Sequence, residues 1–263
     1  MHQIDIVARV EHVASKLGIT SNAIFEKLPH IQLGYEISGK IDRPIGQYID
    51  HTILKTASTH DQVDILCQEA KEHKFYSVCV NGSRVPQCVE SLKGSDVDVA
   101  AVIGFPLGAM TTASKVFETA ELVDMGASEI DMVLNVGKLL DGDYIYVRDE
   151  IAKIAEACKD AKLKVIFETC ELTPELIADA CILSALGNSH FVKTSTGFGK
   201  GGATLDDVRL MKQVVGDFLE VKASGGVRTY PDAVKMIEVG ATRIGTSNGI
   251  AIVTQSATGG SGY

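Results

Sequence analysis

From residue 46 onward, segments typical of strands and of helices alternate along the chain. The strand-like segments are short apolar runs, in order IGQYIDHTIL, FYSVCVN, DVAAVIGFP, EIDMVLN, KVIFETC, HFVKTST, LEVKASGG and TRIGTS. Longer segments with helical periodicity separate them, over Ser58–His73, Ser83–Lys93, Thr111–Met125, Asp143–Lys159, Thr173–Leu186, Thr204–Val215 and Tyr230–Val239. Eight strands, each followed by a helix, predict a (β/α)8 TIM barrel. The alternative is an open doubly wound sheet, but that fold usually carries a G-x-G-x-x-G turn after its first strand, whereas the first strand here ends in HTILKTAST.

The residues before this pattern are typical of a helical extension. Apolar residues recur there at helical spacing and form a stripe of Ile4, Val7, Val10, Val13 and Leu17. Gly18 is expected to end a first helix, after which Thr20 and Ser21 can cap a second. We therefore expect three parts: an N-terminal helical extension over residues 1–45 that packs on the barrel, the barrel over residues 46–255, and a flexible tail over residues 256–263.

Composition limits the partners and the compartment. The net charge is −9 and no basic face or tail is visible, which argues against a nucleic-acid partner. No apolar run approaches membrane-spanning length, so no membrane partner is expected. None of the six cysteines forms a C-x-x-C pair, and no histidine lies at zinc-ligand spacing from them. We expect reduced thiols, no metal, no cofactor and a cytoplasmic protein.

Two lysines end neighbouring strand-like segments: Lys193 in HFVKTSTGFG and Lys222 in EVKASGGVR. An amine is a nucleophile only when neutral, and a lysine at its reference pKa is neutral in roughly one molecule in two thousand at pH 7. A second ammonium group raises that fraction, because two charges about 5 Å apart repel by about 3 kcal/mol at an effective dielectric near 20. The pair predicts imine chemistry. The alternative is that each lysine pairs with a carboxylate and only stabilises the barrel.

The segment EIDMVLN carries two carboxylates on one face. Strand alternation places Glu129 and Asp131 on the same side, and both faces of a parallel barrel strand are buried. Buried carboxylates need partners, and the lysines are natural ones. Asp131 could then shuttle protons, or it could belong to a structural ion-pair network. Asp50 has the same two interpretations. Glu220 shares a face with Lys222 and is a further candidate partner, unless a bulge turns it away.

Glycine-rich loops follow the last two strand-like segments. SGGVR contains Gly225 and Gly226, where the backbone can approach a ligand closely. GTSNG contains Ser247 and Asn248, which could begin the last helix. Because barrel enzymes commonly hold phosphate in these two loops, we predict a phosphate site there. Gly197 and the glycines from Gly199 to Gly202, within GFGKGG, form a loop that could cover the ligand.

Other strand ends carry candidate residues with weaker support. We place Asp50, Lys55 and Cys79 among the candidate substrate-binding residues, since each lies near the end of a strand-like segment. Cys79 lies within VCVN and is expected to be a core thiol, which an aldehyde could modify if it were exposed at the strand end. The histidines are scattered and form no nucleophile–histidine–acid arrangement.

In this order, the motifs closely resemble those of the deoxyribose-phosphate aldolase family. The resemblance runs from about residue 46 to about residue 250 and rests on YIDHTILK, VCVN, VIGFPLG, EIDMVLNVG, KVIFETC, FVKTSTGF, VKASGGVR and RIGTSNG. It implies a class I aldolase that interconverts 2-deoxy-D-ribose 5-phosphate with D-glyceraldehyde 3-phosphate and acetaldehyde without a metal. It also implies a homodimer or homotetramer whose small-molecule partners are the sugar phosphate and acetaldehyde.

The resemblance implies roles for the matching positions. Lys193 would be the Schiff-base nucleophile, Lys222 would lower its pKa, and Asp131 would relay protons with an ordered water. The terminal residue Tyr263, which follows GGSG, matches a tail tyrosine that assists proton transfer at the enamine carbon. The segments that hold the substrate phosphate match Gly197, Gly225, Gly226, Ser247 and Asn248.

Two segments depart from the family pattern. HTILKTAST differs from the expected HTLLKPD form, so the loop after the first strand should differ in shape, and GFGKGGAT brings Lys200 into the phosphate loop. Three other functions remain open at this point: another imine-forming barrel enzyme such as a transaldolase, a metal-dependent aldolase, and a phosphate-binding barrel without catalysis.

Overall fold

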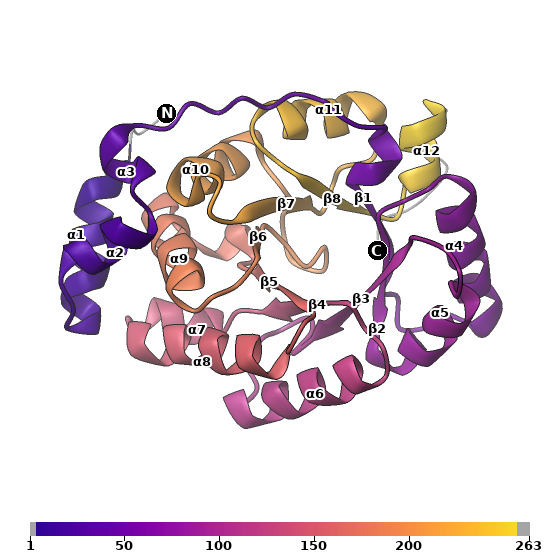
Figure 1. Cartoon of the computed structure of the whole chain (residues 1–263), viewed down its shortest axis with the longest axis horizontal. Coiled ribbons are helices and arrows are strands. Elements are labelled where there is room, and N and C mark those ends of the chain that lie inside the picture. The colour runs from indigo at the N-terminus through magenta and orange to yellow at the C-terminus, as the bar shows by residue number, and fades with distance from the viewer. Residues whose placement is uncertain (1–3, 257–263) are drawn as a thin grey trace.

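The strands form a closed ring of eight, joined in sequence order from β1 to β8 and back to β1 (Figure 1). The computed structural model describes residues 4–256. All neighbouring strands are parallel. The predicted barrel is therefore confirmed, and the open sheet is wrong. The strands are β1 (Ile49–Ile53), β2 (Ser77–Asn81), β3 (Asp98–Ile103), β4 (Glu129–Val133), β5 (Lys162–Ile166), β6 (Phe191–Lys193), β7 (Glu220–Ser224) and β8 (Arg243–Thr246).

Helices surround this ring, as Figure 1 shows. They are α4 (His60–Glu72), α5 (Val85–Ser91), α6 (Thr112–Asp124), α8 (Tyr144–Ala157), α9 (Pro174–Leu186), α10 (Leu205–Val215), α11 (Tyr230–Glu238) and α12 (Gly249–Thr254). Threonine caps begin several of them where the sequence indicated: Thr173 precedes a proline at the first helical position, and the Thr204 side chain accepts from Asp207 N–H. The sequence did not predict the short helices α7 (Val136–Leu140), η1 (Ile45–Tyr48), η2 (Gly82–Arg84) and η3 (Thr169–Glu171).

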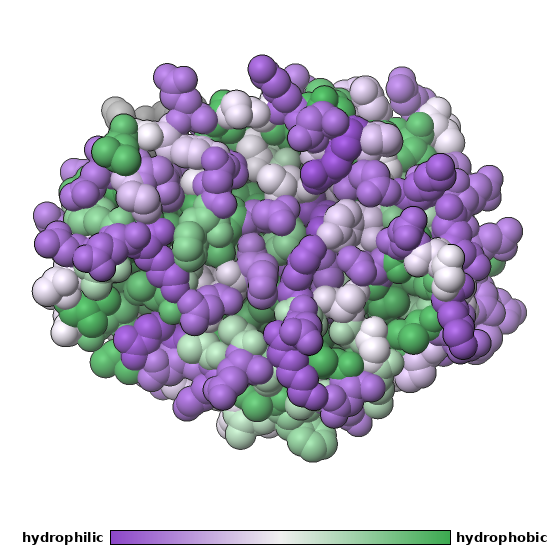
Figure 2. All heavy atoms as spheres, viewed as in Figure 1, coloured by the Kyte–Doolittle hydropathy of each residue, from purple (hydrophilic) through white to green (hydrophobic). Residues whose placement is uncertain are grey.

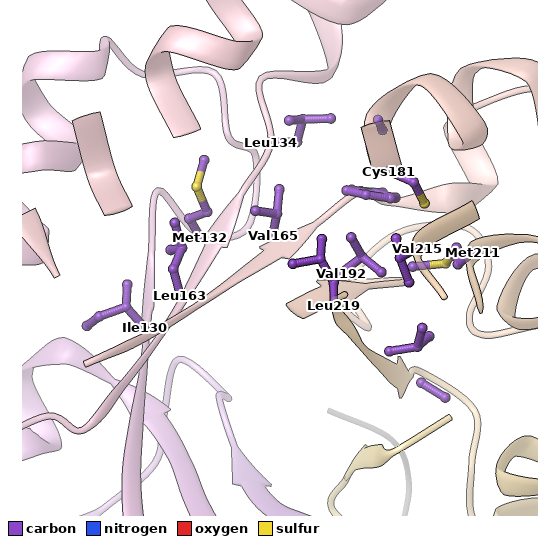
Figure 3. Close-up of a cluster of buried hydrophobic side chains, with 14 of the residues drawn as sticks. Ile130, Met132, Leu134, Leu163, Val165, Cys181, Val192, Met211, Val215 and Leu219 are labelled. Atoms are coloured by element: carbon purple, nitrogen blue, oxygen red, sulfur yellow. The ribbon is translucent and has the colours of Figure 1, made fainter. Parts of the chain in front are cut away.

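The main core lies between the outer faces of the strands and the helices. On β4 the alternate residues Ile130 and Met132 are fully buried in it. Figure 3 shows them beside Leu163 and Val165 of β5 and Val192 of β6, with Cys181 of α9 and with Met211 and Val215 of α10. Because side chains alternate across a strand, the other face of β4 points into the barrel and carries Glu129 and Asp131. The packing of the outer core thus fixes which residues meet inside.

The N-terminal helices α1 (Ile6–Leu17), α2 (Ser21–Lys27) and α3 (His30–Leu33) lie at one side of the barrel, where α1 packs against α8 and α9 (Figure 1). Arg9 of α1 binds Asp179 of α9. Val10, Val13 and Leu17 are buried, whereas Val7 is 40% exposed, so its predicted place in the apolar stripe is wrong. An extended segment then crosses above α10 and α11 to reach β1 (Figure 1).

Within residues 4–256, no helix is long and apolar enough to cross a membrane. Figure 2 shows hydrophilic side chains over much of the centre of one face, with apolar side chains scattered between them. The predicted tail begins at Ser256, and its last residue Tyr263 lies outside the described residues.

Candidate active site

Three lysines surround the carboxylate of Asp131 inside the barrel. Asp131 Oδ2 accepts from Lys193 Nζ at 2.8 Å and from Lys222 Nζ at 2.7 Å. Its Oδ1 accepts from Lys164 Nζ at 2.8 Å. The strand register explains the meeting, because Lys193 pairs with Lys222 across β6 and β7, and Asp131 pairs with Lys164 across β4 and β5. Since both Lys193 and Lys222 contact one oxygen, their nitrogens lie within about 5.5 Å of each other.

A second layer of ion pairs supports this centre. Asp50 Oδ2 lies 2.5 Å from Lys222 Nζ, and Asp50 Oδ1 accepts from Arg243 at 2.7 Å. Glu129 binds Lys164 at 2.5 Å and Arg243 at 3.1 Å. All of these side chains are buried, so each charge needs an opposite partner. The cluster has one more basic than acidic side chain: Lys164, Lys193, Lys222 and Arg243 stand against Asp50, Glu129 and Asp131.

Among the three lysines around Asp131, Lys193 has a lowered pKa, whereas Lys164 and Lys222 have raised ones. Burial is the largest influence on Lys193 and lowers its pKa; Lys222 lowers the pKa further, and Asp131 offsets the two only in part. Burial also disfavours the charge on Lys222, but Asp131 and Asp50 outweigh burial and hold its pKa well above the ordinary value. The pKa of Lys164 is raised as well, because Asp131 and Glu129 outweigh its burial. Lys193 is therefore the lysine of this group that loses its proton most readily.

A glycine-lined cavity of about 260 Å³ lies at the carboxyl ends of β6, β7 and β8. Gly225 and Gly226 have φ of +85° and +84°, a conformation that favours glycine. The basic residues Lys200 and Arg228 line this cavity. So do all of the predicted phosphate-loop residues, which are Gly197, Gly225, Gly226, Ser247 and Asn248. The arrangement can hold an anion through backbone N–H groups and local positive charge.

Residues 45–255 match the model of the DeoC/LacD family of aldolases. The chain belongs to this family. It is 54% identical over 219 residues to a deoxyribose-phosphate aldolase of Streptococcus uberis, covering 83% of this chain and 99% of that protein. It is 55% identical to one of Brevibacillus brevis over the same shares of the two chains. The resemblance inferred from the motifs is thus confirmed, and the protein is an aldolase.

Solved structures agree with this membership. A putative deoxyribose-phosphate aldolase from Coccidioides immitis has a TM-score of 0.82 and 41% identity, over 89% of this chain and 95% of that one. A deoxyribose phosphate aldolase from Aeropyrum pernix, described as having a unique tetrameric structure, has a TM-score of 0.76 and 25% identity, over 95% and 96% of the two chains.

Two further predicted residues of the aldolase lie inside the barrel. Asp50 belongs to the ion-pair cluster through Lys222 and Arg243. Cys79 is fully buried in a small apolar group inside the barrel with Leu54, Ala100 and Val102. Burial raises the pKa of the Cys79 thiol. This position fits the expected core thiol and places it beside the lysines rather than at an exposed strand end.

Lys55 and Glu220 lie apart from the charged centre. The Lys55 side chain is exposed in the loop after β1, where its carbonyl accepts from Ser58. Glu220 is exposed at the start of β7 and lines a surface cavity at the opposite ends of the strands, so its candidate pairing with Lys222 is wrong. Within residues 4–256, no group of three or more His, Cys, Asp or Glu side chains is placed to hold a metal ion.

Sequence reasoning missed two basic residues of the aldolase's cluster. Lys164 and Arg243 are fully buried or nearly so, and each binds two or more of its carboxylates. A signal was present in both cases, because each is a basic residue on a short strand whose neighbouring positions are largely apolar. Which carboxylate each would meet depends on the closed barrel.

Proposed function

We propose that this aldolase reversibly cleaves 2-deoxy-D-ribose 5-phosphate to D-glyceraldehyde 3-phosphate and acetaldehyde through a Schiff base on Lys193. The observation that carries the proposal is that two lysines bound to the same carboxylate oxygen have pKa values shifted in opposite directions. Lys193 has a lowered pKa and Lys222 a raised one, although both bind Asp131 Oδ2. A neutral amine beside a permanent ammonium group is the arrangement that imine formation needs.

In the first step, neutral Lys193 attacks the C1 aldehyde of the open-chain sugar phosphate. The nitrogen forms a bond to C1 and gives up one proton, and the carbonyl oxygen takes up a proton, which gives a neutral carbinolamine. The hydroxyl then takes up a proton, which the Lys222 ammonium group donates and Asp131 relays, and leaves as water while the nitrogen lone pair forms the iminium. The raised pKa keeps Lys222 protonated, so a proton is present there, and Asp131 suits the relay because it touches both nitrogens.

In the second step, the iminium serves as an electron sink for carbon–carbon cleavage. A base removes the C3 hydroxyl proton, the C3 oxygen forms a carbonyl, and the electrons of the C2–C3 bond move into the C1–C2 enamine. D-glyceraldehyde 3-phosphate leaves. Protonation of the enamine at C2 and hydrolysis of the iminium then release acetaldehyde and restore the Lys193 amine.

The glycine-lined cavity is the proposed phosphate site. The net charge of −9 gives no long-range attraction for an anionic substrate, so the attraction has to be local. Gly225 and Gly226 line this cavity without side chains that would separate the backbone from a ligand, and Arg228 adds a positive charge at the same cavity. Relatives named deoxyribose-phosphate aldolase support a phosphorylated substrate.

We also propose that the enzyme works as a homodimer or homotetramer in the cytoplasm. The Aeropyrum pernix relative, described as tetrameric, supports the first point. The described cysteines, all of them free thiols, support the second.

Reductive trapping tests the proposed reaction. The enzyme is incubated with deoxyribose 5-phosphate and borohydride, and the modified peptide is identified by mass spectrometry. The proposal expects one adduct on Lys193. An adduct on another lysine would reassign the nucleophile, and turnover without any adduct that stops on chelator treatment would indicate a metal-dependent aldolase. A panel of sugar phosphates distinguishes this substrate from that of a transaldolase.

A further inference from the structure

Glu168, just beyond the end of β5, has a backbone conformation that is rare for its residue type. Its φ is +55°, in the left-handed region, where a glutamate is strained. The other non-glycine residues with positive φ among residues 4–256 are exposed and follow helices, a common place for this conformation: they are Lys74, Lys159, Asn188 and Gln255. Glu168 follows a strand and is only 9% exposed. Its strain is therefore maintained by the surrounding contacts.

Those contacts come from the loop after β6. The Glu168 carboxylate accepts from the Thr196 hydroxyl and, at 3.4 Å, from Thr196 N–H. The Thr196 hydroxyl oxygen in turn accepts from Phe198 N–H at 3.0 Å. A Cβ added at Gly199 would lie 2.9 Å from the carboxyl carbon of Glu168, so the loop backbone packs directly on this carboxylate. One side chain thus fixes the loop over residues 196–199.

The same loop forms one wall of the proposed phosphate cavity. Gly197 and Gly199 line that cavity opposite the β7 loop, and Gly202 packs against Gly225 so tightly that an added Cβ would lie 2.3 Å from its carbonyl oxygen. The Phe198 ring also packs edge-on against the ring of Phe105, which belongs to the loop after β3, with the two ring centroids 5.3 Å apart. The loop is held at several points, and at Thr196 its hydrogen bonds go to a charged acceptor, the Glu168 carboxylate.

A carboxylate is an unfavourable neighbour for a phosphate, because like charges repel at short range. Its presence beside this cavity needs a reason other than direct binding. The hydrogen bonds to Thr196 supply that reason, since bonds to a charged acceptor are about twice as strong as neutral ones. They hold a glycine-rich segment that would otherwise have much conformational freedom.

We propose that Glu168 is a positioning residue for the substrate phosphate: it fixes Thr196 and thereby holds the loop over residues 197–202 where its backbone faces the anion. This inference rests on the proposed function, because it requires a phosphorylated substrate. Glu168 acts through the loop and does not contact the reacting carbons.

The test compares 2-deoxy-D-ribose 5-phosphate with 2-deoxy-D-ribose, which lacks the phosphate. The variant is Glu168→Asn, because asparagine tolerates the left-handed backbone and the fold should persist. We expect the ratio of the two kcat/KM values to fall about tenfold, mainly through KM for the phosphorylated sugar, as loss of one hydrogen bond to a charged group predicts. Thr196→Val should lower the ratio similarly, and the double variant should lower it no further.

Glu220→Gln is the control, since it removes an exposed carboxylate at the other end of the barrel and should leave the ratio unchanged. If Glu168→Asn left the ratio of the two kcat/KM values at its wild-type value, with or without an equal fall in both, the positioning role would be wrong while the proposed substrate stood. If the wild-type enzyme itself made no distinction between the two sugars, the proposed phosphate substrate would fail, and this inference with it. Should Glu168→Asn fold poorly, the Thr196→Val ratio decides by the same criteria.

Discussion

Replacing Lys222 with leucine tests the central electrostatic argument. The ammonium group of Lys222 lowers the pKa of Lys193, because the two nitrogens share one oxygen of Asp131. Without it, the pKa of Lys193 rises, and a smaller fraction of the amine is neutral at pH 7. The substitution also leaves Asp131 and Asp50 with one cation fewer, which raises the pKa of Lys193 further.

The geometry sets the size of the effect. Two unit charges about 5 Å apart interact with about 3 kcal/mol at an effective dielectric of 20. Each 1.4 kcal/mol is a factor of about ten in an equilibrium constant, so the neutral fraction of Lys193 should fall about 100-fold. If imine formation limits the rate, kcat/KM at pH 7 should fall by about the same factor. Loss of Lys222 as a proton donor would add to this.

The assay is the pH profile of kcat/KM for cleavage of deoxyribose 5-phosphate. The acidic limb reports the proton lost from Lys193 in the free enzyme. Because the pKa of Lys193 rises in Lys222→Leu, this limb should move to higher pH, and part of the lost activity should return in alkaline buffer. Lys164→Leu is a matched control: it removes a buried cation from the other oxygen of Asp131 and should cost stability while moving the limb less.

Two outcomes would refute this reasoning. One is a Lys222→Leu enzyme with a near-normal rate at pH 7. The other is a Lys222→Leu enzyme whose rate falls by the same factor at every pH, since the lysine would then act only as a proton donor or a structural group. Urea unfolding of both leucine variants separates either result from loss of the fold.

Three further changes have defined outcomes. Lys193→Leu should abolish turnover and the borohydride-trapped adduct; an adduct that persists on another lysine would contradict the assigned nucleophile. Asp131→Asn should lower kcat by about 10²–10⁴-fold through lost proton relay and destabilise the fold by about 3–5 kcal/mol in urea unfolding, and a normal kcat would leave the carboxylate a structural role only. Gly202→Ala should raise KM for the phosphorylated sugar about tenfold, because its Cβ would lie 2.3 Å from Gly225 O, whereas Gly137→Ala meets nothing closer than 3.7 Å and should be silent.

The sequence was sufficient to predict the barrel and the inward direction of its central residues. Eight apolar runs separated by helical stretches leave few architectures, and strand alternation is a local property of two-residue period. It placed Asp131 opposite Ile130 and Met132, as the outer core confirms. The lowered pKa of Lys193 also agrees with the expectation from two adjacent lysines.

The partners of these residues required the closed barrel. Strand alternation alone allows Lys222 to pair with Glu220, yet Lys222 binds Asp50, which lies 172 positions away in the sequence. The two meet because β1 and β7 both flank β8 in the closed ring. Lys55 follows the same strand as Asp50 but points to solvent. Burial and pairing are properties of the whole ring, so no local pattern could separate these cases.

What the sequence alone determined is therefore the kind of chain and the set of inward-facing groups: alternating elements, two lysines at neighbouring strand ends, and glycines in the last loops. Only the tertiary structure decided how charge is distributed among them. Closing the ring brought Lys164 and Arg243 to the carboxylates and left one more basic than acidic group in the cluster. A pKa depends on every charge within a few ångströms, and those distances exist only in the folded barrel.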